Sequence, residues 1–422
     1  MFAFSAIFLL LIALLWLALL LSPVHAWTHR HPLNSTTKID VREGDWPRVT
    51  MVIPARNEAA WLPITVPTYC EQDYPDVQVI LVDDQSEDDS PKRLDVLRSR
   101  YKNLTVLKGS TRPEGWCGKP WAVQQGVNWA YQDEEKTPHP NPPPMSTWGE
   151  GTGWLLFTDA DCLFHPTTVM QAMRLARSGD YDAISLLAHM TFGSRFEEIA
   201  LTGLATVLNL ILPMGLSNHP KSSVALAAGG FILVKRSTYE KIGGHEAVKG
   251  QMIEDVMMGR KLKLSGAKLH TRATADLVST RMYDGLADLW EGLSKNAYAG
   301  MDYDPKKFWV GLLMAIAVAV MPPVYFVWTL LAVWRNHSYR AWLLFGLAAV
   351  IVLCQSLIHL RTVRHMKLPL WHCLLMPASA ALYAAIVCNS AWQHHFAGGN
   401  VWAGRRYDRE MLLEGTRDLT EE

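Results

Sequence analysis

The uneven spread of apolar residues is the feature that most constrains how this 422-residue chain folds. The segment from residue 2 to residue 21 carries no charged side chain, and three more apolar blocks follow residue 307. Because a helix needs about 20 apolar residues to cross the ~30 Å hydrocarbon core of a bilayer, each of the four is long enough to span it. The sequence therefore predicts an N-terminal anchor (1–22), a domain of ordinary globular composition (45–305), C-terminal transmembrane helices (308–393) and a polar tail (394–422).

The N-terminal segment has one alternative interpretation, a cleaved signal peptide. A signal peptide has a basic region before a shorter apolar core, and this chain begins with neither. We therefore expect an uncleaved anchor. Basic residues appear only after it, which by the positive-inside rule places the following domain in the cytoplasm.

The topology of the C-terminal third stays open at this stage. The apolar blocks there are residues 308–334, 341–360 and 368–392. The basic loop 361–367 is expected on the cytoplasmic side, but the block after it would then carry Arg405, Arg406 and Arg409 outside, against the same rule. A break at Pro322-Pro323 that turns the first block into a re-entrant or interfacial hairpin would remove this conflict.

The charge balance excludes one broad class of function. The chain has 40 basic and 40 acidic side chains and hence no net charge. A protein that binds nucleic acid would be expected to carry a basic excess. We therefore expect no nucleic-acid partner, and the sequence identifies no protein partner.

Two aspartates follow directly on an apolar stretch in the middle of the chain. Residues 154–157 predict a short strand, and Asp159 and Asp161 come next, separated by one small residue. Carboxylates at positions i and i+2 beyond a strand end can converge on one hard cation, of the kind that a nucleotide diphosphate needs. Aspartates also cap helices and fill turns, so this motif alone is weak evidence for a metal site.

Two further strands are predicted upstream, at residues 49–54 and 77–82, with helical patterns between them. Strands that alternate with helices indicate βαβ units and a parallel sheet, whose ligands bind beyond the carboxyl ends of the strands. Asp83 and Asp84 follow the second strand at that edge, where an acidic side chain can accept hydrogen bonds from a base or a ribose. Ser86 and Asp88 fit a helix cap as well as a ligand contact.

A glycine-rich stretch, residues 115–120, contains Lys119, which offers a point charge for a phosphate. A plain turn with an exposed lysine explains this stretch equally well. Its position between the two acidic motifs favours the phosphate role. The proline-rich stretch that follows, residues 133–153, is expected to be an exposed loop.

Glu254 and Asp255 form a third acidic site, at the start of a predicted amphipathic helix. Acids at a helix N-terminus are stabilised by the helix dipole, so capping alone would explain them. A displacement by a hydroxyl group also needs a carboxylate that takes the hydroxyl proton. Asp255 is the candidate for that base, with Glu254 beside it.

The combination of these motifs resembles glycosyltransferase family 2, the inverting GT-A fold. The resemblance covers about residues 45–300, and its motifs occur in the family's order: Pro54-Ala55-Arg56-Asn57-Glu58, Asp83-Asp84-Gln85-Ser86, residues 115–119, Thr158-Asp159-Ala160-Asp161 and Glu254-Asp255. It implies an α/β domain with a mostly parallel central sheet that binds a nucleotide sugar. A UDP-sugar is the expected donor, and Mg²⁺ or Mn²⁺ is the expected cofactor.

The same resemblance assigns roles to individual residues. Asp159 and Asp161 would bind the metal ion, and Asp255 would be the catalytic base, with Glu254 next to it. Binding of the donor would involve Pro54, Arg56, Glu58, Asp83, Asp84, Lys119, Asp159 and Lys295. For Lys295, a lysine on a helix surface without a role in binding is the alternative.

The chain departs from processive members of the family, which carry a Gln-x-x-Arg-Trp motif after the Glu-Asp site. It has Arg281-Met282-Tyr283 and a Trp-x-Gly-x-x-Lys-Asn pattern that ends at Asn296. With the membrane layout, these features look most like the bacterial hopene-associated glycosyltransferase group, and carotenoid-acid glycosyltransferases are similar in layout. The resemblance implies a membrane lipid as acceptor, with a hopanoid as the candidate and a carotenoid-type lipid as the alternative.

Two expectations concern the membrane. The apolar run 199–216 is interrupted by polar residues, so we expect a buried core helix there. The alternative is an interfacial helix that seats the domain beside the lipid acceptor. The resemblance also implies a multi-pass protein of the cytoplasmic (inner) membrane, with its catalytic domain in the cytoplasm.

Two other functions compete with sugar transfer. Paired carboxylates can hydrolyse glycosides without a metal ion or a nucleotide. A membrane scaffold with a degenerate transferase domain would keep the fold without the activity. The intact acidic motifs favour the transferase.

Overall fold

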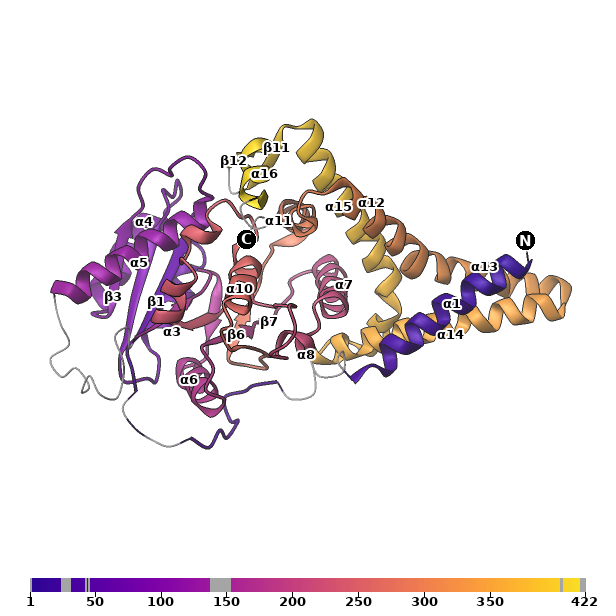
Figure 1. Ribbon diagram of the computed structural model, residues 1–422, viewed down its shortest axis with the longest axis horizontal. Helices are drawn as coiled ribbons and strands as arrows, with labels where there is room; N and C mark the ends of the chain where they lie inside the picture. The colour runs from indigo at the N-terminus through magenta and orange to yellow at the C-terminus, as the bar shows by residue number, and fades with distance from the viewer. Residues whose placement is uncertain are drawn as a thin grey trace. The chain divides into compact units, whose positions relative to one another are not determined.

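The computed structural model describes residues 2–23, 32–41, 44, 46–136, 153–402 and 405–417. The chain divides into two compact units, drawn as ribbons in Figure 1. The helical unit comprises residues 1–31, 192–215 and 283–400, and the sheet unit comprises residues 32–191, 216–282 and 401–422. Two segments of the predicted domain 45–305 thus cluster with the helical unit, and the domain bounds stay a prediction. Most of the proline-rich stretch 133–153 lies outside the described residues.

The sheet unit is built on a seven-stranded sheet with the order β3-β2-β1-β4-β8-β6-β9. Its strands are β1 (Val49–Ala55), β2 (Val77–Asp83), β3 (Leu104–Lys108), β4 (Trp154–Phe157), β6 (Ala183–Leu187), β8 (Ile232–Lys235) and β9 (Leu269–Ala273). Only β8 is antiparallel to its neighbours within this sheet. A smaller sheet consists of β5 (Cys162–Phe164), β7 (His189–Met190) and β10 (Val278–Thr280). The predicted α/β class with a mostly parallel central sheet is confirmed.

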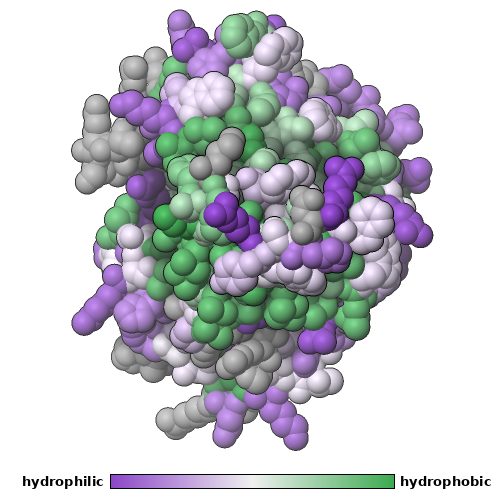
Figure 2. Space-filling model, turned by 90° about the vertical axis from the view of Figure 1, so that its right-hand side faces the viewer, coloured by the Kyte–Doolittle hydropathy of each residue, from purple (hydrophilic) through white to green (hydrophobic). Residues whose placement is uncertain are grey.

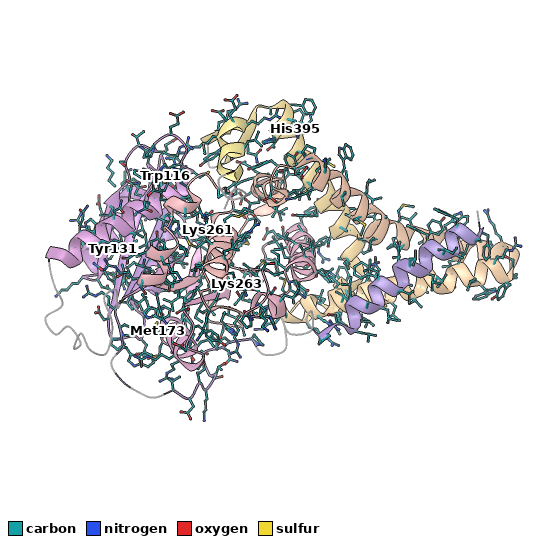
Figure 3. The ribbon with its side chains drawn as sticks, viewed as in Figure 1. Trp116, Tyr131, Met173, Lys261, Lys263 and His395 are labelled. Atoms are coloured by element: carbon teal, nitrogen blue, oxygen red, sulfur yellow. The ribbon has the colours of Figure 1, made fainter. Side chains whose placement is uncertain are left out.

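Helices cover both faces of the large sheet because successive strand residues point to opposite sides. In β1, Met51 and Ile53 join the core on one side, and Val52 joins the core on the other. Met173 and Tyr131, both labelled in Figure 3, pack in these two cores. Helices of the sheet unit are α3 (Leu62–Cys70), α4 (Ser90–Arg100) and α6 (Thr168–Ser178) on the first side, and α5 (Gly118–Lys136), α9 (Arg236–Lys241), the 3-10 turn Glu246–Val248 and α10 (Glu254–Leu264) on the second.

Strand register brings three loops to one edge of the sheet. Ala55 at the end of β1 pairs with Asp83 at the end of β2. Val52 of β1 pairs with Phe157 at the end of β4. Because all three strands are parallel, the residues that follow them leave the sheet at the same end, where ligands of such sheets bind.

Among the described residues, four helical segments are long and apolar enough to cross a membrane. They coincide with the four apolar blocks of the sequence. The helices are α1 (Phe2–Leu21), α12 (Pro305–Met314) continued by a π-helical turn (Ala315–Val320) and α13 (Met321–Asn336), α14 (Tyr339–His365), and the 3-10 turn Leu370–Leu375 continued by α15 (Met376–Phe396). α1 and α13 both pack along α14, whereas α15 runs across their direction (Figure 1).

Large apolar side chains remain exposed on these helices. Trp309, Trp328 and Trp334 are each more than half exposed. Hydrophobic residues also gather over much of the face in Figure 2. A surface of this kind is expected where lipid, and not water, surrounds a helix.

The break at Pro322-Pro323 that would remove the topology conflict does not occur, because the chain continues through it as one helical segment, Pro305–Arg335. Each proline lacks the N–H that would bond the carbonyl four residues earlier, which frees the oxygens of Val318 and Ala319. The Trp16 indole N–H donates to the Val318 oxygen over 2.9 Å. The Gln355 amide donates to both oxygens, over 3.0 and 3.3 Å. Neighbouring helices thus supply the missing donors, so no hairpin forms.

The apolar run 199–216 is mostly α7 (Arg195–Ile211), which is followed by α8 (Met214–Ser217). One side of α7 packs on α14 and α15, where Thr206 donates to Thr362 over 2.9 Å and Ser379 donates to the Ile199 carbonyl over 2.7 Å. Other positions expose Phe196 (55%) and Ile211 (65%). This division fits an interfacial helix better than a wholly buried one. The helical unit also contains α11 (Gly285–Ala297) and the 3-10 turn Ala299–Met301.

After α15, the chain forms a small C-terminal structure. Strands β11 (Gly399–Trp402) and β12 (Arg405–Asp408) make a two-stranded sheet, and α16 (Arg409–Arg417) follows. Residues from 401 onward belong to the sheet unit. This part of the predicted polar tail is therefore folded.

Candidate active site

Lys119 is the centre of the charged cluster at the loop edge of the sheet. It lies in the first turn of α5, and its Nζ is 2.6 Å from Asp159 Oδ1 and 2.7 Å from Glu254 Oε1. Burial by itself lowers the pKa of Lys119, but the surrounding carboxylates together raise it well above its ordinary value. Lys119 is therefore a fixed positive charge that joins α5, the loop after β4 and the start of α10.

Asp255 approaches Lys119 and Asp159 across the backbone of Gly229. The Gly229 N–H donates to Asp255 Oδ2 over 2.8 Å. A Cβ atom at position 229 would lie 2.8 Å from Lys119 Nζ, 3.0 Å from Asp159 Oδ2 and 3.4 Å from Asp255 Oδ2. One point of bare backbone is thus within contact distance of a cation and two carboxylates.

Glu254 and Asp255 are neighbours in sequence but have different surroundings. Both begin α10, as predicted. Glu254 is buried, and its carboxylate pairs with Lys119. Burial raises the pKa of Glu254, and Lys119 partly offsets that rise. Asp255 is only half-buried, and one of its oxygens is held by Gly229. Of the two carboxylates, Asp255 is the more accessible to a substrate.

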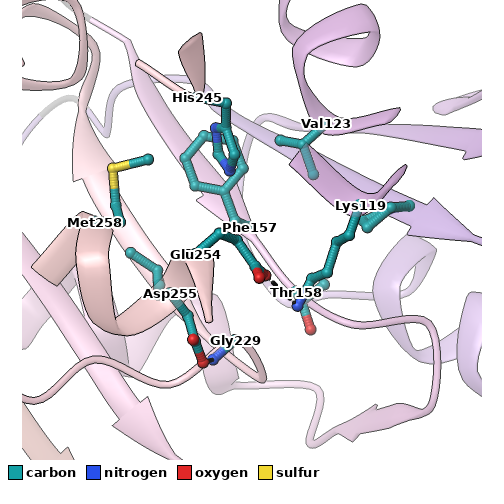
Figure 4. Close-up of a pocket in the computed structure, with 11 residues that line it drawn as sticks. Lys119, Val123, Phe157, Thr158, Gly229, His245, Glu254, Asp255 and Met258 are labelled. Carbon is teal, nitrogen blue, oxygen red and sulfur yellow. Dashed lines mark hydrogen bonds and ion pairs between the residues drawn. The ribbon is translucent and has the colours of Figure 1, made fainter. Parts of the chain in front are cut away.

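A pocket opens over this cluster, and Figure 4 shows the side chains around it. His245 also lines the pocket, although no sequence motif predicts it as a site residue. Burial and the charge of Lys119 lower the pKa of His245 to about 3, so its ring is neutral. Its Nδ1 lies 2.8 Å from the Tyr239 hydroxyl. The pocket is lined by Pro54, Lys119, Val123, Phe157, Thr158, Gly229, Ile232, His245, Glu254, Asp255 and Met258.

Asp161 lies beside Asp159, where a cation would fit. The Thr280 hydroxyl donates to Asp161 Oδ2 over 2.9 Å. Burial and the neighbouring charge of Asp159 raise the pKa of Asp161 to about 6. Two carboxylates that crowd each other offer hard oxygen ligands and would be stabilised by a divalent ion. Within the described residues no group of three or more His, Cys, Asp or Glu is arranged for a metal.

The predicted nucleoside residues lie in the adjoining loops after β1 and β2. The Arg56 guanidinium donates to the carbonyls of Asp84 and Gln85, over 2.8 and 2.7 Å. Asp83 accepts from the Ser86 N–H over 3.1 Å. The Glu58 N–H donates to the Ser90 hydroxyl at the start of α4 over 2.8 Å. The structure therefore brings Arg56, Glu58, Asp83 and Asp84 to one pair of loops beside Pro54.

Backbone strain also marks these two loops. Asn57 (φ 58°) and Gln85 (φ 59°) both have a positive φ, which asparagine adopts more readily than glutamine does. The Asn57 side chain accepts from the Glu87 N–H over 2.8 Å, which holds the loops together. Strain of this kind is concentrated at functional sites.

Lys295 is the one predicted site residue that belongs to the helical unit, where it lies on α11. Its role at the diphosphate stays a prediction. The other predicted residues all belong to the sheet unit, at the loop edge of its large sheet.

Comparison with known proteins identifies the family. Residues 50–243 match the family model for glycosyl transferase family 2. The chain carries a family 2 glycosyltransferase domain. The predicted family and enzyme class are therefore confirmed for this domain, whose central sheet is mostly parallel as predicted.

Curated relatives of this glycosyltransferase include the 4,4'-diaponeurosporenoate glycosyltransferase of Staphylococcus haemolyticus (strain JCSC1435). It is 24% identical over 265 residues, which cover 61% of this chain and 64% of the relative. The chain thus spans less than two thirds of that relative's length. The enzyme of the same name from Staphylococcus aureus (strain USA300) is 23% identical over 370 residues, which cover 85% of this chain and 88% of the relative.

Solved structures similar to this glycosyltransferase include a mannosyltransferase from Pyrobaculum calidifontis in complex with GDP-Man and Mn²⁺. It is 17% identical, covers 94% of this chain and 99% of its own, and has a TM-score of 0.45. Residues 1–349 of TarS from S. aureus, in complex with UDP-GlcNAc, are 13% identical, cover 86% and 96% of the two chains and have a TM-score of 0.37.

Proposed function

We propose that this glycosyltransferase moves a sugar, with inversion, from a nucleotide-diphosphate donor to a lipid acceptor at the cytoplasmic face of a membrane. A UDP-sugar is the proposed donor. The observation that carries the proposal is the meeting of Lys119, Asp159, Glu254 and Asp255 around the bare backbone of Gly229. Such a site offers a cation for a diphosphate and a carboxylate for a proton within one pocket.

The donor would bind along the edge where β1, β2 and β4 end. The base and ribose would contact the loops that hold Arg56, Glu58, Asp83 and Asp84. Pro54, which lines the pocket, would lie between these loops and the bound sugar. Lys119 would contact the diphosphate, because its charge persists throughout the neutral range. Asp159 and Asp161 would hold Mg²⁺ or Mn²⁺, and that ion would neutralise the charge that develops on the leaving diphosphate.

Asp255 is the proposed base. The Gly229 N–H holds Oδ2 of Asp255 and the Val256 N–H holds Oδ1, each over 2.8 Å. A carboxylate oxygen has a second lone pair, which would accept the proton of the acceptor as that group attacks the sugar carbon. Glu254 cannot take this role without losing its ion pair, because its carboxylate is buried against Lys119. We therefore assign Glu254 to the positioning of Lys119.

The lipid acceptor is supported by the membrane helices and by the named substrate of the relatives. Four segments could span a bilayer. Relatives that act on 4,4'-diaponeurosporenoate favour a carotenoid-type lipid. A hopanoid, implied by the hopene-associated resemblance, is the other proposed acceptor. Both are extended apolar molecules with one polar end, which suits a site close to the bilayer.

The test is transfer of label into lipid. Membranes that contain the protein are incubated with radiolabelled nucleotide sugars, and extracted lipid is counted. For Asp255→Asn we expect transfer to fall roughly 10²- to 10⁴-fold, the usual loss when a general base is removed. Calorimetry should show donor binding within about twofold of wild type, since the asparagine keeps the size of the side chain.

Glu254→Gln is the matched control at the neighbouring position. It removes the charge next to Lys119, so we expect weaker donor binding along with slower transfer. If Asp255→Asn transfers sugar at the wild-type rate, Asp255 is not the base. If wild-type membranes label no lipid with any nucleotide sugar, the proposed function is wrong. Labelling that persists in a metal chelator would argue against a metal-dependent reaction.

A further inference from the structure

The C-terminal segment contacts the predicted nucleoside loop through one arginine. Arg405 of β12 lies with its Nη1 2.5 Å from Asp84 Oδ2 and its Nη2 3.1 Å from Asp84 Oδ1. Nη2 also lies 3.2 Å from the Asp84 carbonyl oxygen and 3.0 Å from Gln85 Oε1. A two-pronged pair of this kind fixes the orientation of a carboxylate as well as its charge.

Asp84 depends on this pair because it is almost wholly buried, with 4% of its surface exposed. A buried carboxylate without a partner is costly. Burial raises the pKa of Asp84, and the bonds from Arg405 partly offset that rise. Arg56 holds the same loop through its carbonyls from another direction. Two arginines from distant parts of the sequence therefore set the shape of residues 84–87.

The same C-terminal segment reaches the start of α5, next to Lys119. A Cβ atom at Gly118 would lie 2.6 Å from Arg405 Nη1 and 3.2 Å from the Tyr407 hydroxyl. Tyr407 is 1% exposed. The Arg112 guanidinium lies over its ring, 5.1 Å from the centroid, and donates to the carbonyl of Trp116, which is labelled in Figure 3. Arg405 and Tyr407 thus join the Asp84 loop to the stretch that carries Lys119.

We infer that the segment after the last apolar helix completes the donor site, with Arg405 as a positioning residue for the nucleotide sugar. Arg405 holds Asp84 and the Gly118 backbone in the arrangement that the nucleoside and diphosphate need. This inference rests on the proposed function, because it gives Arg405 a role in binding that donor. Nothing in the local sequence around Arg405 indicates it, since Asp84 lies 321 positions away.

The test compares steady-state kinetics of the full-length protein in membranes for Arg405→Ala and Arg406→Ala. Arg406 is the matched control, because it is the adjacent arginine and its side chain is exposed. We expect Arg405→Ala to raise KM for the nucleotide sugar roughly 10- to 100-fold, the range for loss of charged hydrogen bonds. The rate at saturating donor should change less than about threefold, because Arg405 does not touch the proposed base or metal ligands. Arg406→Ala should match wild type.

Two further measurements separate positioning from a general loss of fold. Added guanidinium ion should lower the raised KM of Arg405→Ala and leave Arg406→Ala unchanged, because it restores the missing group. Arg405→Lys should recover only part of the affinity, since an ammonium ion cannot form the two-pronged pair. Wild-type transfer together with an unchanged KM in Arg405→Ala would overturn the inference alone. A raised KM that guanidinium leaves in place would also overturn it. Absence of transfer by the wild type would overturn the proposed function and, with it, this role.

Discussion

At the residue scale, Gly229 sets how closely the charged groups of the active site approach each other. A methyl group there would press on Lys119 Nζ and Asp159 Oδ2, at 2.8 and 3.0 Å. Lys119 cannot swing away cheaply because two carboxylates hold it. We expect Gly229→Ala to lower the transfer rate by about 10²-fold, since displacements near 1 Å at a reacting centre have that effect. Initial rates with saturating nucleotide sugar would measure it.

Gly153→Ala is the matched control for Gly229→Ala. It adds the same methyl group to a glycine of the sheet unit, away from the charged cluster. A Cβ atom at Gly153 meets only the Arg48 carbonyl oxygen, at 3.9 Å, which is an ordinary contact. It should leave the transfer rate unchanged. An active Gly229→Ala would mean that Lys119 and Asp159 do not need their present spacing for catalysis.

Much of this site could be predicted from the sequence, because its acidic motifs each lie at the end of a strand or the start of a helix. Asp159 follows a strand, and Glu254 begins a helix. Lys119 also lies in the first turn of a helix, and the parallel sheet brings the three side chains together. His245 and Arg405 follow no such pattern. His245 lies in a turn without a motif, and Arg405 lies beyond the membrane helices. Both join the site only through tertiary packing, which no local pattern encodes.

At the element scale, the two prolines of the long helical segment explain how α1 is held. Val318 accepts from Trp16 and Gln355, and Ala319 accepts from Gln355. Gln355→Leu should destabilise the protein by about 1–3 kcal/mol, because the Ala319 oxygen loses this bond in apolar surroundings. Trp16→Phe should cost less, since Gln355 still donates to Val318. The double variant should cost more than the sum. Thermal unfolding in detergent would measure all three.

The control for the tryptophan is Trp328→Phe, at a side chain that is 58% exposed. It should change the unfolding temperature less than Trp16→Phe does. A cleaved N-terminal segment could not affect the stability of the mature protein at all. Equal, negligible effects of Trp16→Phe and Trp328→Phe would therefore favour the signal-peptide interpretation.

The elements that the sequence predicts best are those with a strong apolar signal. The four apolar blocks and the strands β1, β2 and β4 lie where they are expected. The short strands β3 and β9 are not predicted, because their residues mix buried and half-exposed positions with basic ones. The continuous helical course through Pro322 is not predicted either, since it depends on donors from α1 and α14.

At the scale of the whole molecule, the C-terminal segment limits how the chain crosses the membrane. Arg405 and Asp84 belong to the same compact unit. The chain leaves that unit at residue 283 and returns to it at residue 401. A water-soluble unit lies on one side of a bilayer, so the number of crossings between these points is even. Three segments there are apolar enough to span, so we expect that one of them does not cross.

The segment that does not cross is expected to be Leu370–Phe396. Its mean hydropathy is the lowest of the four. It buries Ser379, Ser390 and His394, and its α15 part packs on α7, α11 and the π-helical turn Ala315–Val320 more than on α14. A helix that lies in the interface would carry such polar groups at lower cost than a spanning one. Arg405, Arg406 and Arg409 then lie on the same side as the basic loop 361–367, in agreement with the positive-inside rule.

Cysteine labelling in sealed vesicles tests this topology. The six native cysteines are first replaced, and single cysteines are introduced as Lys92→Cys, Arg406→Cys and His337→Cys. Lys92 lies in the sheet unit, Arg406 follows the last helix, and His337 lies between α13 and α14. We expect a membrane-impermeant maleimide to label the first two from one side only and His337→Cys from the other, since an even number of crossings separates the first pair. Labelling of Arg406→Cys together with His337→Cys would mean that α15 crosses, and the Arg405–Asp84 pair could then not form in the membrane.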